Sequence, residues 1–68
     1  MKIIEKLSDM IADEIECAEK YAKCALNYKE DRPALAETFY RISNEKMADM
    51  ALLHGQVTAI IDEYRKKN

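Results

Sequence analysis

Apolar side chains recur along the first half of the chain at the spacing of an α-helix. A step that alternates three and four residues selects one stripe: Ile4, Leu7, Ile11, Glu14, Ala18, Tyr21, Ala25 and Tyr28. Such a stripe is typical of an amphipathic helix with one buried face. Because neither proline nor glycine interrupts it, we expect a first helix over about residues 3–29.

A second stripe, with steps of three or four residues, follows the only proline. Its members are Leu35, Phe39, Ile42, Lys46, Asp49, Leu53, Val57, Ile60 and Tyr64. The period continues beyond Gly55, so we expect a single helix over about residues 33–66. Glycine weakens a helix interior, and Gly55 therefore marks either a kink or a place where another backbone comes close.

The connection between the stripes is short and polar. Pro33 disfavours a helical conformation at Arg32 and suits the first turn of a helix. We therefore expect a turn over about residues 30–32, and a short connection makes the two helices antiparallel neighbours. The predicted fold is all-α: one domain over residues 1–68 that forms a long antiparallel helical hairpin.

A hairpin of this size leaves part of its apolar surface in water. Two helices cannot cover each other's stripes on all sides, and short chains seldom bury enough apolar area alone. Pairing two hairpins into a four-helix bundle removes the remaining strip from solvent. We therefore predict a homo-oligomer, most simply a dimer with two-fold symmetry.

Composition narrows the classes of partner. The chain has 13 acidic and 11 basic residues and a net charge of −2, which is too balanced for a nucleic-acid-binding surface. It has no run of 18 apolar residues and no charged-then-apolar leader. We therefore expect neither a membrane span nor a signal peptide, and a cytoplasmic location.

The two cysteines do not predict a disulfide within the chain. Cys17 and Cys24 are seven residues apart, which is about 10 Å along a helix and too far for a bond. We expect small, partly buried, reduced side chains; the alternative is a symmetric disulfide between two chains.

Three charged residues occupy stripe positions where apolar side chains belong. Glu14 does so in the first helix, and Lys46 and Asp49 do so in the second. A symmetric turn places all three at one level, where Lys46 can pair with both carboxylates. In a dimer, four carboxylates at one level form the ligand set of a di-metal site, whereas two lysines repel a cation. The alternatives are a buried salt-bridge layer, a metal site and a solvated layer.

The same residues carry a resemblance to a known family. Glu14 lies seven residues before Tyr21, and the second helix contains Asn-Glu-Lys-Met-Ala-Asp at residues 44–49. This pattern resembles the two-helix hairpins of the ferritin-like superfamily, in particular encapsulated-ferritin and rubrerythrin-type segments. The resemblance implies a ferritin-like four-helix bundle in which a first-helix glutamate and a Glu-x-x-His motif bind iron. Glu14 matches that glutamate, while Lys46 and Asp49 stand at the positions of the motif's Glu and His.

Two functional hypotheses follow. The first is a non-enzymatic homo-oligomer with a lost di-iron site and no cofactor, in which Glu14, Lys46 and Asp49 form a buried charge layer. It acts by protein–protein interaction, and its small size suits an accessory protein encoded by a phage or mobile element. The second is a metal-binding protein that oxidises or handles iron, or holds another divalent cation, through Glu14 and Asp49 of both chains.

The remaining candidates favour packing over chemistry. His54 is the only histidine and lies five residues after Asp49, a spacing that places the two side chains on different helix faces. We expect it to be packed or half-exposed rather than a ligand. The resemblance implies a role in oxidation for Tyr21, and the alternative is an aromatic at the bundle rim. The sequence contains no Ser/His/Asp arrangement or phosphate-binding glycine loop.

Overall fold

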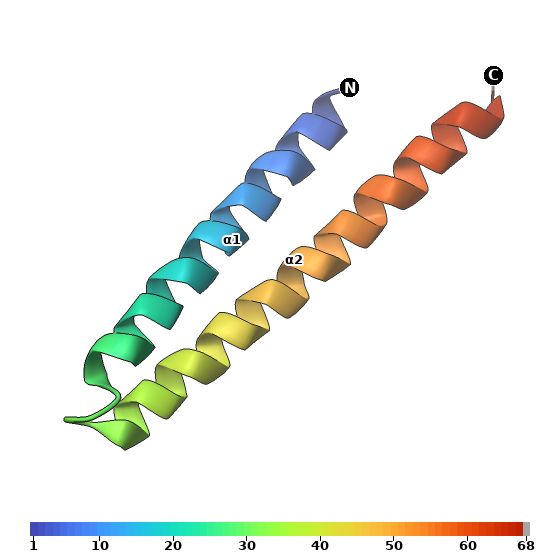
Figure 1. Ribbon diagram of the computed structural model, residues 1–68. Coiled ribbons are helices and arrows are strands. Elements are labelled where there is room, and N and C mark those ends of the chain that lie inside the picture. The colour runs from blue at the N-terminus through green and yellow to red at the C-terminus, as the bar shows by residue number, and fades with distance from the viewer. Residues whose placement is uncertain (68) are drawn as a thin grey trace.

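The computed structural model describes residues 1–67 and consists of two α-helices joined by a tight turn (Figure 1). Helix α1 spans Lys2–Tyr28 and helix α2 spans Pro33–Lys67. The two helices pack side by side in opposite directions. The predicted helical hairpin is therefore confirmed, whereas its pairing into a bundle stays a prediction.

The turn is stabilised by main-chain hydrogen bonds on both sides of Pro33. The amide of Arg32 donates to the oxygen of Tyr28 over 2.9 Å, and the amide of Ala36 donates to the oxygen of Arg32 over 3.0 Å. Arg32 thus accepts the first hydrogen bond of α2, as a residue at a helix N-cap does. At the other end of α2, basic residues fill the last turn and complement the negative end of the helix dipole.

Small side chains form the seam between the helices. The residues that are buried are Ala18 and Ala25 on α1, and Ala36 and Ser43 on α2. Each helix contributes two of them at a spacing of seven residues, so they face the partner helix at two successive levels. Because the distance between packed helices depends on the side chains at the contact, these residues bring the two backbones close together.

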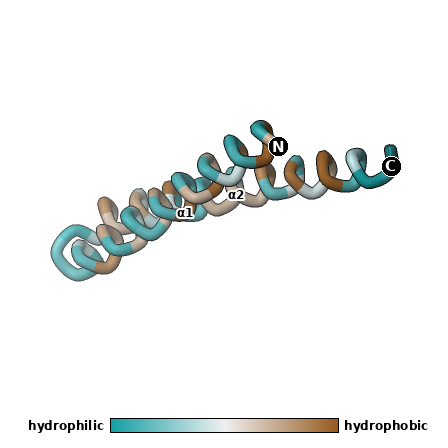
Figure 2. The backbone as a smooth tube through the Cα atoms, turned by 90° about the horizontal axis from the view of Figure 1, so that it is seen from above, coloured by the Kyte–Doolittle hydropathy of each residue, from teal (hydrophilic) through white to brown (hydrophobic). Residues whose placement is uncertain are grey.

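The larger apolar side chains flank this seam and remain partly in solvent. The hairpin measures 57 × 15 × 10 Å, so it is one layer of helices thick. Leu26 and Leu52 are 73% and 72% exposed, and within residues 1–67 no large side chain is fully buried. Figure 2 shows apolar segments along both helices and a hydrophilic turn. The chain therefore presents an apolar surface instead of an enclosed core.

Helix α2 is the longer helix and extends past the start of α1 (Figures 1 and 2). It runs without interruption through Gly55, as the sequence indicates. A Cβ atom built on Gly55 would meet nothing within 4 Å, so none of residues 1–67 approaches closely there. Among the helices described, none has the length and apolar character needed to cross a membrane.

Candidate functional site

An ion pair joins the two helices near the middle of α1. Nζ of Lys46 lies 3.8 Å from Oε1 of Glu14, and the two side chains are 33% and 21% exposed. The packing of α2 against α1 therefore brings together two of the three charged residues that sequence reasoning placed at one level. Partial burial reduces the solvent screening of this pair relative to a pair between fully exposed side chains.

The second carboxylate oxygen of Glu14 is left without a partner. Oε2 of Glu14 is buried, and within the part of the chain that the structure describes it accepts no hydrogen bond. A buried acceptor without a donor costs about 1–3 kcal/mol. Oε2 of Glu14 therefore has capacity for one further hydrogen-bond donor or cation.

Asp49, the third predicted member, is exposed. Among residues 1–67 it forms no ion pair, and Lys46 pairs with Glu14 alone. Ser43 faces α1, and Met50, seven residues further on, continues that face and is partly buried. Asp49 lies about 100° around the helix from Met50, which accounts for its exposure. Its participation in a charge layer or a metal site of an assembly stays a prediction.

Sequence reasoning missed a buried polar contact one turn from Lys46. Oγ of Ser43 donates a hydrogen bond to the main-chain oxygen of Ala18 over 2.8 Å, and Ser43 is only 8% exposed. The signal was present in the sequence as small residues seven apart on each helix. This signal is weak because serine is exposed more often than buried in folded proteins.

Tyr21 belongs to an aromatic cluster between the charged layer and the turn. The ring of Phe39 lies 6.1 Å from that of Tyr21 and 6.2 Å from that of Tyr28, with tilts of 36° and 38°. These separations are typical of favourable aromatic pairs. Packing between the helices therefore accounts for the position of Tyr21, and a role in oxidation stays a prediction of the resemblance.

A metal site is not assembled by the described residues of one chain. In residues 1–67, no three His, Cys, Asp or Glu side chains gather where they could hold a metal ion. His54 is exposed, and Cys17 and Cys24 are partly exposed and unbonded. The predicted ligands Glu14 and Asp49 therefore need further donors from a second chain to form a metal centre.

A groove opens on one face of the hairpin near the turn. Its volume is about 500 Å³. Residues from both helices line it: Ala22, Ala25, Leu26, Lys29, Pro33, Ala36, Glu37 and Tyr40. Most of these side chains are apolar, and Lys29 and Glu37 contribute one charge of each sign. The groove is therefore suited to an apolar side chain from a partner.

No protein-family model, curated protein or solved structure matches the chain. The likeness to the ferritin-like superfamily accordingly remains a prediction that rests on the pattern around Glu14, Lys46 and Asp49.

Proposed function

We propose that this protein is a non-enzymatic homo-oligomer whose hairpins pair into a four-helix bundle and which acts by protein–protein interaction. One observation carries the proposal: among the described apolar residues, only Ala18, Ala25 and Ala36 are buried. All three are alanines, which have the smallest apolar side chain. Every larger apolar side chain among the described residues keeps part of its surface in solvent within one chain.

The exposed area supports the same conclusion. The chain exposes 5640 Å² of surface for a mass of 7.9 kDa. A compact monomer of that mass exposes about 4,400 Å², so the excess is roughly 1,200 Å². A standard interface buries about 800 Å² on each partner. Association with a second copy through an interface of that size would remove about two thirds of the excess.

The charged layer supports a non-enzymatic role within this proposal. In the ferritin-like pattern a carboxylate stands at position 46, and here the ammonium group of Lys46 lies 3.8 Å from Glu14. A cation at that distance neutralises the carboxylate and repels a metal ion. We propose that the layer is a di-iron site that has been replaced by an ion pair, which sets the register of the two helices.

Sedimentation equilibrium over a range of protein concentrations tests this proposal. We expect the mass of a dimer and a melting midpoint, followed by circular dichroism, that rises with chain concentration. A folded monomer at micromolar concentration, with a midpoint independent of concentration, would contradict it.

One observation favours a second candidate, a metal-binding protein. The buried, unpartnered Oε2 of Glu14 is a suitable ligand for a divalent cation. In this alternative, Glu14 and Asp49 of two chains share the metal, and Lys46 turns outward. Metal content per chain after purification decides between the candidates: near-stoichiometric iron, manganese or zinc supports the second, and a metal-free, stable dimer supports the first.

A further inference from the structure

We propose that the groove near the turn is the docking site for a second copy of this chain, arranged so that Leu26 of each copy enters the groove of the other. This inference rests on the proposed self-association and names the surface that produces it. A two-fold symmetric contact requires that one surface carry both the protruding group and the cavity that receives it. The groove and its borders meet that requirement in shape and in charge.

The shape of the groove combines a cavity with protruding side chains. Three alanines line the cavity, namely Ala22, Ala25 and Ala36, and the last two are buried. Leu26 and Tyr40 belong to the same lining and are 73% and 60% exposed. A leucine and a tyrosine from a partner fit a groove of about 500 Å³, and their insertion removes both from water.

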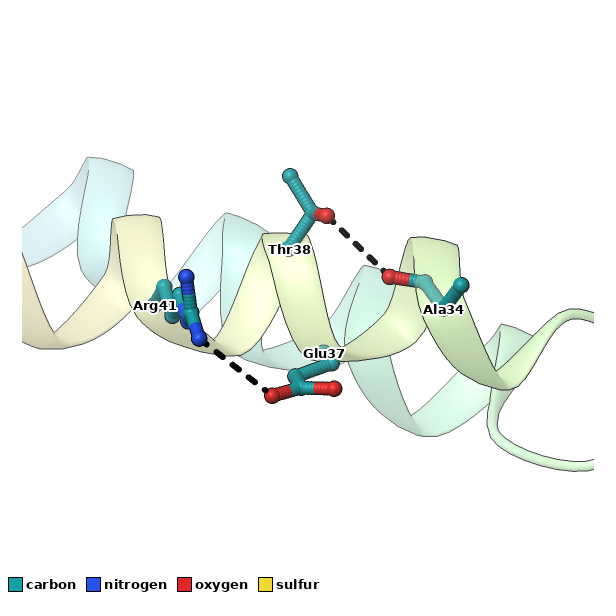
Figure 3. Close-up of polar contacts among 4 residues, drawn as sticks. All are labelled: Ala34, Glu37, Thr38 and Arg41. Atoms are coloured by element: carbon teal, nitrogen blue, oxygen red, sulfur yellow. Dashed lines mark hydrogen bonds and ion pairs between the residues drawn. The ribbon is translucent and has the colours of Figure 1, made fainter.

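The charges on the groove suit a copy of the same surface. Lys29 follows α1 and Glu37 lies on α2, and both line the groove. A two-fold rotation can therefore place Lys29 of each copy near Glu37 of the other, whereas a surface of one sign would repel itself. Glu37 also pairs with Arg41 on its own helix over 3.6 Å (Figure 3), but both side chains are at least 70% exposed. Such an exposed pair contributes little and leaves the carboxylate able to bind a second cation.

A partly apolar surface continues from the groove along α2. Tyr40, Met47, His54 and Ile61 follow one another at intervals of seven residues and therefore lie on one side of the helix. All four are exposed, with Met47 at 44% and Ile61 at 36%. The surface thus extends for about 30 Å along α2, which is long enough for the pairing of two hairpins side by side.

Two substitutions with equal exposure test the assignment. Leu26→Glu places a charge in the proposed contact, and Leu52→Glu places the same charge on a leucine that is 72% exposed and does not line the groove. We expect Leu26→Glu to raise the dissociation constant of the dimer at least about 30-fold, as loss of a central interface side chain does. Leu52→Glu should leave it within about threefold. Both constants are measured by sedimentation equilibrium.

A charge exchange provides an independent test. Lys29→Glu should weaken the dimer about tenfold, because two carboxylates then face each other across the symmetric contact. The double variant Lys29→Glu/Glu37→Lys should recover most of that loss. Its dissociation constant is compared with that of Glu37→Lys alone, because that variant also places a lysine beside Arg41. Absence of recovery would contradict the reciprocal pairing of Lys29 and Glu37.

A third surface separates failure of this inference from failure of the proposed function. Ile3, Met10, Cys17 and Cys24 form another stripe with a spacing of seven residues, and none of them lines the groove. A dimer that tolerates Leu26→Glu but is lost in Met10→Glu would overturn the groove assignment and leave self-association intact. A wild-type protein that is monomeric at every concentration would overturn both.

Cross-linking keeps the inference testable if Leu26→Glu does not fold. In a chain that carries Cys17→Ser and Cys24→Ser, Leu26→Cys should give a covalent dimer with a short bis-maleimide. Leu52→Cys in the same background is the matched control and should remain single chains. Equal yields from the two positions would overturn the assignment.

Discussion

Oγ of Ser43 donates a hydrogen bond to the main-chain oxygen of Ala18, 2.8 Å away on the opposite helix. The bond crosses the seam between the two helices, where both residues are buried. Because the bond joins a side chain of α2 to the backbone of α1, it restricts both the sliding of the helices along their axes and their rotation about them. It therefore helps to set the register that brings Lys46 to Glu14.

Ser43→Ala should lower the free energy of unfolding by about 1 kcal/mol, because it removes this buried hydrogen bond without changing the volume of the seam much. Ser43→Leu should lower it by about 1–3 kcal/mol, because the larger side chain forces the helices apart. Urea unfolding followed by circular dichroism measures both values. Ser8→Ala, at an exposed position, is the control, and an equal loss there would contradict the role of Ser43.

Lys46→Met should lower the free energy of unfolding by about 1–3 kcal/mol, because it leaves the partly buried carboxylate of Glu14 without its cation. Adding Glu14→Gln to Lys46→Met should recover part of that loss, since the double variant contains no unpaired charge. Arg41→Met is the comparison at the exposed ion pair and should cost less than about 0.5 kcal/mol. Equal losses in Lys46→Met and Arg41→Met would show that the interhelical pair is as solvated as the surface pair.

Gly55→Ala should raise the free energy of unfolding by roughly 1 kcal/mol, because alanine favours the helical conformation and the added Cβ meets nothing within 4 Å. Ala51→Gly, one turn earlier at an exposed position, should lower it by a similar amount. Thermal and urea unfolding give both values. A loss of stability in Gly55→Ala would indicate that another chain packs its backbone against this position.

Lys46→Glu combined with Asp49→His should create a metal-binding protein if the charged layer descends from a di-iron site. The double variant restores a Glu-x-x-His motif next to Glu14, and binding of iron or zinc should raise its melting midpoint by mass action. Lys46→Glu with Ala48→His is the control, because position 48 lies about 100° around the helix from position 49. A folded double variant that binds no metal would contradict the ferritin-like origin of the layer.

The helical hairpin could be predicted from the sequence because its signals are local. The apolar period extends through both helices, and the single proline lies where α2 begins. The ion pair between Glu14 and Lys46 follows from the same register, since an antiparallel turn places residues at equal distances from it side by side. These inferences use only helix geometry and the chemistry of proline.

The position of Asp49 shows why the details of the site could not be predicted in the same way. The apolar period places Leu35, Ile42 and Asp49 in one stripe, which predicts that Asp49 lies on the packed face. The structure instead buries Ala36 and Ser43, because small residues allow the closest approach of the helices. The packed face shifts by one residue at these points, so Met50 takes the place predicted for Asp49, while Phe39 and Lys46 are partly buried as predicted. Hydropathy alone does not contain this information.

The seam of small residues has a consequence for how the sequence tolerates change. In most globular proteins the large apolar residues are the least replaceable, since their loss leaves cavities. Here the positions that tolerate the fewest substitutions within one chain are 18, 25, 36 and 43. Ala or Ser is buried at each of them, and a larger side chain would push the helices apart. Natural variation among related chains should therefore be narrowest at these four sites. At the large apolar positions, the residue types should change together with the surface of the partner that covers them.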